Sequence, residues 1–267
     1  MRMLLFATLP FFLICIGTSY ALDYLSDRTQ PTTIQETHGE RRFRPITHHL
    51  PDVQNIRDCG GWKTQSGRHV RTGRIYRTAE LNNVNPDRPH RNFVLSEESR
   101  SFFRDSLKIR TDIDLRNDKE CTGMTASPLG PDITWVHIPS MAYSKIGLTE
   151  GKVAFKKVFQ TLLQEKNYPA IIHCRQGRDR AGTAIYLINA LLGVPEQDLR
   201  HDWELTERLK RNARFDYGKI SGVESALHQY PGTTINEKVQ AFVLSLGFTQ
   251  DDIMHFRTLM LEPDTVQ

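Results

Sequence analysis

The sequence has little of what marks several common protein classes. Its 267 residues include only four cysteines, and they contain no Asn-x-Ser/Thr sequon, no Walker-type loop and no dinucleotide-binding glycine pattern. The formal net charge at pH 7 is only +4. A general nucleic-acid-binding protein would carry a larger basic excess gathered on one face. We therefore expect no nucleic-acid partner, and any affinity for anions must come from a local site.

The composition is that of an ordinary globular protein, with 39% hydrophobic and 25% charged residues. No internal repeat or low-complexity tract interrupts it. Without the first 21 residues, 267 − 21 = 246 residues remain. A chain of that length buries roughly 70–75% of the surface that its unfolded form exposes. We therefore expect a packed core that needs neither a metal nor a disulfide.

The N-terminus has the pattern of an export signal. Arg2 supplies a positive charge, an apolar stretch runs from Met3 to Gly17, and small residues precede a cleavage site after Ala21. An uncleaved membrane anchor is the alternative, but the apolar run is shorter than the about 20 residues that span a bilayer. We predict a signal peptide at residues 1–21 and an exported protein, periplasmic or extracellular, with no stable membrane span after cleavage.

Export would change the redox environment of the cysteines. Cys59, Cys121 and Cys174 would remain in an oxidising compartment, where an odd number of thiols leaves one unpaired. A Cys59–Cys121 disulfide and two buried free thiols are both open, because a sequence does not give the separation of Cα atoms. In either case one cysteine needs a reason to stay free.

Folded structure is expected to begin near Val53. Residues 22–50 are polar and predict an extended or flexible arm, and residues 51–262 are predicted to form one domain. Apolar runs bounded by turn residues predict buried strands at 75–77, 109–115, 133–138 and 170–173. Helical spacing over 151–164 places a helix between the last two strands. This order predicts an α/β fold with a central, mostly parallel sheet that is covered on both faces and flanked by helices.

The C-terminal third is predicted to be helical. An apolar helix at 185–192 ends at Gly193 and Pro195, as those residues dictate. Amphipathic segments follow at 198–212, 223–230, 235–246 and 251–261, and Thr249 is the expected N-cap of the last. Because these segments are short and amphipathic, we expect them to pack on the same sheet rather than to form a separate lobe.

The chemistry is concentrated between His173 and Thr183. A buried strand ends in Cys174, a five-residue loop containing Gly177 follows, and Arg180 opens an apolar helix. The N–H groups of such a loop and the helix N-terminus can bind phosphate, and Arg180 can hold two of its oxygens. The same field would stabilise a thiolate at Cys174 and make it a nucleophile near neutral pH. A buried structural cysteine is the alternative.

This loop resembles the signature of the cysteine-dependent protein tyrosine phosphatase superfamily, which is His-Cys, five residues and Arg. The chain is most similar to the atypical bacterial branch of tyrosine and lipid-like phosphatases. The segments that match this branch are Asn-Ile-Arg-Asp-Cys-Gly-Gly at 55–61, Arg-Ile-Tyr-Arg at 74–77, Asp-Leu-Arg at 114–116 and Arg-Asp-Arg at 178–180. The resemblance spans about residues 55–206 and implies a tyrosine phosphatase-like fold with phosphate monoester hydrolysis.

The resemblance also implies roles for individual residues. Cys174 would form a phosphocysteine, and Arg180 and the loop amides would stabilise charge on the phosphate oxygens. His173 would order the loop, and Arg116 and Asp58 would support the site, the latter within a turn at 55–61. The remaining phosphate-binding positions would be Arg175, Gln176, Gly177, Arg178 and Ala181.

The acid that protonates the leaving oxygen is expected to be Asp179 or Asp114. Residues 139–144 contain no carboxylate, so the mobile Trp-Pro-Asp loop of many tyrosine phosphatases has no counterpart here. In the matched branch the candidates lie in the phosphate loop and at the end of the Asp-Leu-Arg strand. Asp114 also lies beyond the carboxyl end of a strand, where sites of parallel sheets form. Either aspartate could instead be a structural partner of an arginine.

Two departures from the family pattern bear on activity. Ala181 stands where the family usually has Ser or Thr, whose hydroxyl helps the cysteine to leave, so slower turnover is expected; Thr183 comes two residues later and is not equivalent. Arg175, Arg178 and Arg180 crowd the loop, which suits substrates with more than one phosphate. Alternatively, the first two of these arginines point to solvent or pair with nearby acids.

We predict an enzyme that needs no cofactor and no metal, because no cluster of His, Cys, Asp and Glu has metal-ligand spacing. The expected substrates are phosphorylated proteins of the phosphotyrosine or phosphoserine type, phosphoinositides or inositol phosphates.

Two other functions stay open. One is a non-catalytic phosphate-binding pseudophosphatase. The other is a rhodanese-like sulfurtransferase, which also places a loop cysteine at a helix N-terminus but needs no arginine at the position of Arg180.

Overall fold

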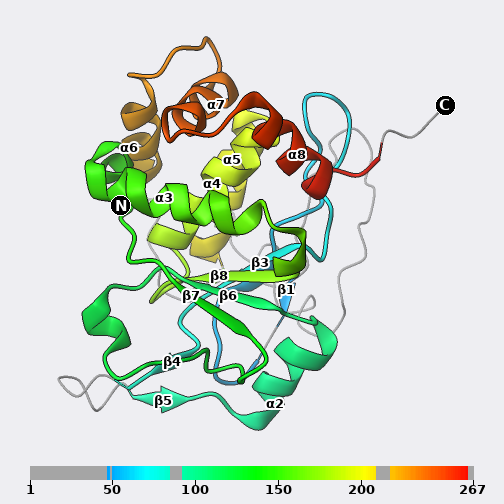
Figure 1. The fold of residues 1–267 in the computed structure, drawn as a ribbon, viewed down its shortest axis with the longest axis vertical. Helices are drawn as coiled ribbons and strands as arrows, with labels where there is room; N and C mark the ends of the chain where they lie inside the picture. The colour runs from blue at the N-terminus through cyan, green and yellow to red at the C-terminus, as the bar shows by residue number, and fades with distance from the viewer. Residues whose placement is uncertain (1–46, 49, 85–91, 209–216, 264–267) are drawn as a thin grey trace, which may run out of the picture.

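Six strands form the central sheet of the computed structural model, which describes residues 47–48, 50–84, 92–208 and 217–263 (Figure 1). Their order across the sheet is β1 (Thr47–His48), β2 (Ile56–Asp58), β3 (Ile75–Thr78), β8 (Ala170–His173), β6 (Thr111–Asp114) and β7 (Thr134–His137). Neighbours from β3 to β7 run parallel, while β1 with β2 and β2 with β3 are antiparallel. The predicted α/β fold with a mostly parallel sheet is confirmed.

All four predicted strands are present, and three of them lie in the middle of the sheet. Every residue of β3, β6 and β8 is buried, as continuous apolar runs predict. Burial of β7 on both faces is wrong, because β7 is an edge strand in which Thr134 is exposed and the other residues are only partly buried. The apolar signal came from Ile133 and Ile138, which are buried but flank the strand.

The parallel strands bring their carboxyl ends to one edge of the sheet. Thr78 of β3 and Asp114 of β6 both pair with His173, the last residue of β8. The segments that follow these strands therefore meet beside the loop that begins at Cys174. Open α/β sheets bind their ligands at this edge.

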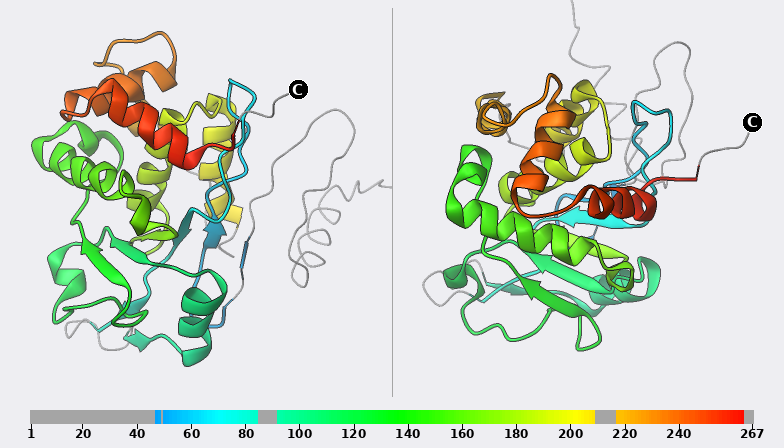
Figure 2. Two further views of the ribbon diagram at one scale, coloured as in Figure 1. Left: turned by 45° about the vertical axis from the view of Figure 1, so that its right-hand side comes forward. Right: turned by 45° about the horizontal axis from the view of Figure 1, so that its top comes forward.

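Helices cover one face of the sheet, and a smaller layer covers the other (Figures 1 and 2). The first layer consists of α3 (Thr149–Leu162), α4 (Asp179–Leu191), α5 (Glu196–Arg208), α6 (Tyr217–Leu227), α7 (Ile235–Ser245) and α8 (Gln250–Met260). The second contains α2 (Glu97–Ser101) and the hairpin of β4 (Asn82–Asn83) and β5 (Phe93–Val94). One apolar cluster joins Ile113 and Ile172 to the helical layer, and another joins Ile171 to Phe103. The C-terminal helices therefore share the core of the sheet, as the sequence predicts.

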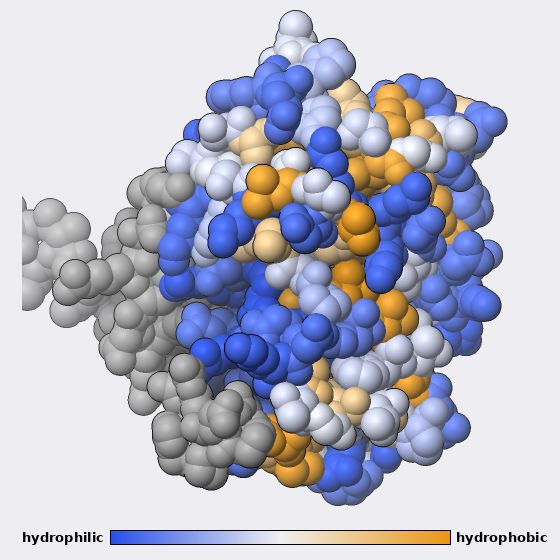
Figure 3. Space-filling model, turned by 60° about the vertical axis from the view of Figure 1, so that its left-hand side comes forward, coloured by the Kyte–Doolittle hydropathy of each residue, from blue (hydrophilic) through white to orange (hydrophobic). Residues whose placement is uncertain are grey.

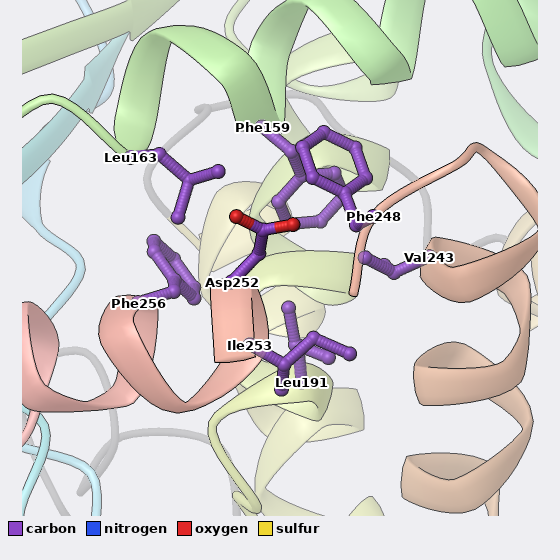
Figure 4. Close-up of a pocket in the computed structure, with 8 residues that line it drawn as sticks. All are labelled: Phe159, Leu163, Leu191, Val243, Phe248, Asp252, Ile253 and Phe256. Carbon is purple, nitrogen blue, oxygen red and sulfur yellow. The ribbon is translucent and has the colours of Figure 1, made fainter. Parts of the chain in front are cut away.

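The C-terminal helices begin where their capping residues place them. Thr249 caps α8, as predicted, and Thr234 caps α7 in the same reciprocal way. Residues of α3, α4, α7 and α8 line a small apolar cavity that is partly open and has room for about one water molecule (Figure 4). The carboxylate of Asp252 at this cavity accepts hydrogen bonds from the backbone N–H and hydroxyl of Thr249, both at 2.8 Å. This cavity is too small for a substrate.

Several elements and segments differ from the sequence-based expectations or lie outside them. The strands β1, β2, β4 and β5 and the helix α2 were not predicted, since they are short and, apart from β5, mostly polar. Within the predicted arm at 22–50, residues 47–48 form β1, while the predicted signal peptide at 1–21 lies outside the described residues. In the described part of the chain no helix is both long and apolar enough to span a membrane.

Only a few large apolar side chains are exposed on the described part of the surface. On the face in Figure 3, apolar residues form a broken band between hydrophilic areas. The large hydrophobic residues that are most exposed are Val84 and Val94 at the β4–β5 hairpin, Leu148 and Val153 at the start of α3, and Met254 in α8. Single exposed apolar residues are normal in soluble proteins. They do not point to a docking surface.

Candidate active site

The predicted phosphate loop connects the buried end of β8 to the N-terminus of α4. Gly177 has a φ of +63°, and a Cβ atom there would lie 2.4 Å from the carbonyl oxygen of Thr78, so this turn requires glycine. Cys174 is 2% exposed, whereas Arg175 is partly buried and Gln176 is exposed. The loop thus places a buried thiol beside a helix N-terminus, where anions bind readily.

Arg180, in the first turn of α4, forms a bidentate ion pair with Glu120. Its Nη1 lies 2.6 Å from Oε2 and its Nη2 lies 3.0 Å from Oε1, and Nη1 also donates to the carbonyl oxygen of Leu115. Burial alone would raise the pKa of Glu120, but the hydrogen bonds and charge of Arg180 bring it below its ordinary value. The pair fixes the plane of the guanidinium group.

Sequence reasoning missed Glu120, although a signal was available. Asn117 and Glu120 form a capping box around the short 3-10 helix Asp118–Cys121, in which each side chain accepts from the backbone N–H of the other residue. An Asn followed three residues later by Glu is a recognised pattern of a helix start. What the sequence does not show is that this helix lies against Arg180.

Asp114 ends β6 and lies, fully buried, in the guanidinium fork of Arg116. The Nη2 of Arg116 is 2.7 Å from Oδ2, and both Nε and the backbone N–H donate to Oδ1 at 3.0 Å. Burial alone would raise the pKa of Asp114, but the charge of His173 and the contacts of Arg116 hold it well below its ordinary range. Asp114 is therefore a buried carboxylate that remains charged at neutral pH.

His173, predicted to order the loop, is fully buried and lies beside two aspartates of β6. Its Nε2 is 2.9 Å from Oδ1 of Asp112 and 3.8 Å from Oδ2 of Asp114. The other oxygen of Asp112 accepts a hydrogen bond from the hydroxyl of Ser127 at 2.7 Å. Sequence reasoning missed Asp112, because an aspartate inside an apolar strand has no neighbour in sequence that indicates its partner.

Asp179 is the first residue of α4 and pairs with the residue before it. Its Oδ1 accepts from Nε of Arg178 at 2.9 Å, and the two side chains are 32% and 19% exposed, respectively. Burial works to raise the pKa of Asp179, but hydrogen bonds from Tyr143 and Arg178 outweigh it and lower the pKa. Of the two alternatives for Arg178, the structure thus shows pairing with an acid.

Glu80 is a further carboxyl group at the loop that sequence reasoning did not identify. Its backbone N–H donates to the carbonyl oxygen of Arg175 at 3.3 Å, and its Oε2 lies 3.6 Å from Nη1 of Arg116. Burial raises the pKa of Glu80 despite the opposing charges of Arg116 and Arg175. The charge of Arg175 therefore also acts on a nearby acid.

Asn55, which directly precedes β2, and Arg77 of β3 hold the outer side of the loop. The amide of Asn55 and the guanidinium of Arg77 both donate to the carbonyl oxygen of Gly177, at 2.9 and 2.7 Å. Arg77 also lies 2.9 Å from Asp202 in α5. The segments 55–61 and 74–77, on which the family resemblance rests, thus contain residues that contact the loop.

Asp58 supports the turn after β2. Its Oδ1 accepts from the backbone N–H of Gly60 at 2.7 Å, and its Oδ2 accepts from that of Gly73 at 2.6 Å. A Cβ atom on Gly60 would lie 2.1 Å from the carbonyl oxygen of Arg71, so the close approach of the two segments requires glycine. Asp58 thereby positions the start of β3, which carries Arg77 to the loop.

Thr183 does not supply the hydroxyl that is absent at Ala181. Its Oγ1 donates to the carbonyl oxygen of Asp179 at 2.9 Å and accepts from the backbone N–H of Tyr143 at 3.3 Å. The hydroxyl thus joins α4 to the segment after β7. Ala181 itself is fully buried.

All three described cysteines are free, so the alternative of a Cys59–Cys121 disulfide is not realised. Burial raises the pKa of Cys59 well above its ordinary value and that of Cys121 to about 12. Both are protonated at neutral pH and pack as small buried side chains. Cys174 differs from both in its place, since it directly follows β8 and opens the loop that leads to α4.

The described residues contain no group of three or more His, Cys, Asp or Glu side chains that could hold a metal ion. The side chains that surround the loop are arginines with carboxylate partners. Such a site can bind an anion through N–H groups and act through a thiolate nucleophile.

A family model and two curated proteins match this chain. The model of a family described as the tyrosine phosphatase family matches residues 48–262. A Cupriavidus necator protein, whose name places it among tyrosine-protein phosphatases, is 26% identical over 188 residues, which are 61% of this chain and 63% of that protein. A tyrosine-protein phosphatase of Nostoc commune is 24% identical over 131 residues, or 39% and 42% of the two chains. The matches thus span less than two thirds of either relative.

Two solved structures of the yeast protein Siw14 are also similar. One is the core catalytic domain of this Saccharomyces cerevisiae PP-IP phosphatase with citrate; it has 15% identity and a TM-score of 0.38, and the match covers 62% of this chain and 84% of that one. The other, of the Siw14 catalytic core, has 14% identity and a TM-score of 0.40 and covers 71% and 92%.

Proposed function

The chain belongs to the tyrosine phosphatase family, and from this premise we propose that it hydrolyses phosphate monoesters through a phosphocysteine on Cys174. The observation that supports this most is the loop itself. The buried Cys174 directly follows β8, Arg180 lies in the first turn of α4, and Arg77 holds the carbonyl oxygen of Gly177 between them. The reaction needs no group beyond these side chains and water.

In the first step the thiolate of Cys174 attacks phosphorus, and the bond from phosphorus to the leaving oxygen breaks. The loop N–H groups and the guanidinium of Arg180 stabilise the charge on the three equatorial oxygens. An acid gives its proton to the leaving oxygen, so the alcohol departs neutral. Because Glu120 already fixes the guanidinium plane, Arg180 does not have to reorganise during this step.

We propose Asp179 as this acid and Asp114 as a structural partner of Arg116. A proton donor must reach the leaving oxygen. Asp179 is partly exposed at the start of α4, whereas Asp114 is fully buried in a guanidinium fork. A bound phosphate brings negative charge close to Asp179, and such a charge raises the pKa of a carboxyl group. Substrate binding therefore favours the protonated form that the acid role requires.

In the second step water attacks phosphorus, and the bond from phosphorus to sulfur breaks. The carboxylate of Asp179 takes a proton from the water, inorganic phosphate leaves, and the thiolate is restored. No hydroxyl at position 181 assists the departing sulfur, and that of Thr183 is engaged elsewhere. Hydrolysis of the phosphocysteine is therefore expected to be slower than in family members that carry this hydroxyl.

The proposed substrates are phosphoproteins of the phosphotyrosine or phosphoserine type, phosphoinositides and inositol phosphates. Every one of these presents a phosphate monoester to Arg180. A second phosphate could bind Arg178, but it would have to displace the carboxylate of Asp179. Single and multiple phosphates thus place different demands on the loop.

A phosphate-release panel tests the proposal. We expect the wild-type chain to release phosphate from an aryl phosphate and from at least one of four classes, which are phosphotyrosine peptide, phosphoserine peptide, phosphoinositide and inositol phosphate. Cys174→Ser should abolish release. Cys121→Ser is the matched control, since a serine hydroxyl can replace the thiol that donates to Asp114, and it should retain activity.

Three outcomes would contradict the proposal. Turnover that persists in Cys174→Ser would exclude a phosphocysteine. Absence of turnover on every substrate would favour the phosphate-binding pseudophosphatase, and transfer of sulfur from thiosulfate would favour the sulfurtransferase.

A further inference from the structure

The carbonyl groups of Gln176, Gly177 and Arg178 in the phosphate loop accept hydrogen bonds from side chains outside the loop. Asn55 donates to the carbonyl oxygen of Gln176 at 3.3 Å and to that of Gly177 at 2.9 Å. Arg77 donates to the carbonyl oxygen of Gly177 at 2.7 Å and to that of Arg178 at 3.4 Å. Because a trans peptide unit is planar, the N–H that follows each held carbonyl points the opposite way. These contacts therefore turn consecutive N–H groups away from β3.

The side chains that hold the carbonyls are themselves anchored to one carboxylate in α5. Asp202 binds Arg77 through Oδ2 at 2.9 Å and Arg57 through Oδ1 at 3.4 Å, and its carbonyl oxygen accepts from Arg57 at 3.0 Å. Arg57 also donates to the side-chain oxygen of Asn55. Asp202 thus links to both donors of the loop, to Arg77 directly and to Asn55 through Arg57.

Burial makes this arrangement rigid. Arg57 and Arg77 have no exposed surface, and Asp202 has 4%. Long side chains in such a position have no water with which to exchange partners. Two buried guanidinium groups with only one carboxylate between them would repel each other if the carboxylate were neutralised.

We propose that Asp202 is a positioning residue of the phosphate site, which fixes Arg77 and Arg57 and through them the inward direction of the loop N–H groups. This inference rests on the proposed function, because it assumes that the loop binds phosphate. It assigns a role in the reaction to helix α5, which contributes no residue to the loop.

The direction in which Asp202→Asn changes phosphate affinity distinguishes a positioning role from a role that depends on charge alone. If Asp202 acted only through its negative charge, then Asp202→Asn would leave the positive charge of both arginines and phosphate would bind more tightly. If Asp202 acts by positioning, the amide presents two donor hydrogens to an arginine, the contact breaks, and the loop N–H groups lose their direction. Phosphate would then bind more weakly.

The experiment measures binding of inorganic phosphate by calorimetry to the full chain in a Cys174→Ser background. Asp202→Asn should weaken binding at least about tenfold, as expected when one hydrogen bond to a charged group is lost. The control is Glu196→Gln in the same helix, whose carboxylate is 48% exposed and pairs with Arg200 on the surface; it should bind phosphate like the parent. Binding is measured at a temperature at which circular dichroism shows each variant folded.

Tighter or unchanged binding by folded Asp202→Asn overturns the proposal, even if the variant melts at a lower temperature. If this variant does not fold, Arg77→Lys tests the proposal instead. It keeps the charge but cannot contact Asp202 and Gly177 together, so it should bind phosphate more weakly, and unchanged binding would overturn the proposal. Turnover by the wild-type chain tests the proposed function separately, so the two can fail independently.

Discussion

Replacement of Asp114 by asparagine is expected to damage stability rather than proton transfer. The substitution keeps the shape of the side chain but removes the charge that faces Arg116. Both side chains are completely buried, and three side-chain contacts of 2.7–3.1 Å join them. Removal of one partner from a buried ion pair costs about 3–5 kcal/mol, because it leaves an uncompensated charge in the interior.

Because of neighbouring groups, we expect the loss in the free energy of unfolding to lie toward the lower end of that range. Arg116 still has the carboxylate of Glu80 at 3.6 Å and the carbonyl oxygen of Asn82 at 2.6 Å. A loss of about 3 kcal/mol is nevertheless large for a domain whose total stability is about 5–15 kcal/mol. Urea unfolding followed by circular dichroism measures it. Asp118→Asn, at a side chain that is 87% exposed, is the control and should leave the unfolding midpoint nearly unchanged.

The pH dependence of the loss has a defined sign. The pKa of Asp114 is lowered in the folded protein, so its stabilising contribution is fully present above the unfolded pKa of about 3.9 and disappears as the pH falls through the folded value. The difference in the free energy of unfolding between wild type and Asp114→Asn should thus be largest at pH 7 and become smaller below about pH 4. Wild-type stability in the variant, together with a selective loss on alkyl phosphates, would refute this reasoning and make Asp114 the acid.

Other expectations concern the loop and the leader. Arg180→Lys should lower kcat for an aryl phosphate by about 10²–10³-fold, because it loses paired oxyanion contacts, and a steady-state assay that shows near-normal kcat would contradict this. Asp179→Asn should lower hydrolysis of alkyl phosphates by about 10²–10⁴-fold and of aryl phosphates less, whereas Glu150→Gln should change neither; the opposite pattern in the two variants would move the acid to the segment after β7. Arg178→Ala should raise KM about tenfold for substrates with several phosphates and leave KM for aryl monophosphates unchanged, and equal effects on both would exclude a second phosphate subsite. Expression with export should yield a chain that begins at residue 22, as N-terminal sequencing can establish, and an intact residue 1 would favour the uncleaved anchor.

Sequence patterns identified the elements that form the middle of the fold. The apolar runs of β3, β6 and β8 are continuous because these strands are buried on both faces. The strand β2 was missed because Arg57 and Asp58, both buried, interrupt its apolar pattern. Their burial depends on partners that fold against them from α5 and from the turn before β3, which no local pattern can indicate.

The same limit applies to the site. Cys174, Gly177 and Arg180 lie in one short loop, so their spacing alone indicates phosphate chemistry. Glu120 lies 60 residues from Arg180, and Asp202 lies 145 residues from Arg57. A charged residue far away in the sequence has no spacing by which its partner can be recognised, and only the packing of the sheet and helices brings the two together.

The arrangement of charge bears on how a nearly neutral chain would hold the phosphate of the proposed substrates. Arg180 and Arg116 each have a carboxylate partner, so neither adds much net charge to the site. Arg57 and Arg77 share one carboxylate, and the surplus positive charge therefore lies behind the loop, in the interior. Salt ions screen exposed charges strongly and buried charges much less. Under the proposed function, attraction of a phosphate monoester to the loop would thus depend on a fixed interior charge and on oriented N–H groups, neither of which requires a basic surface.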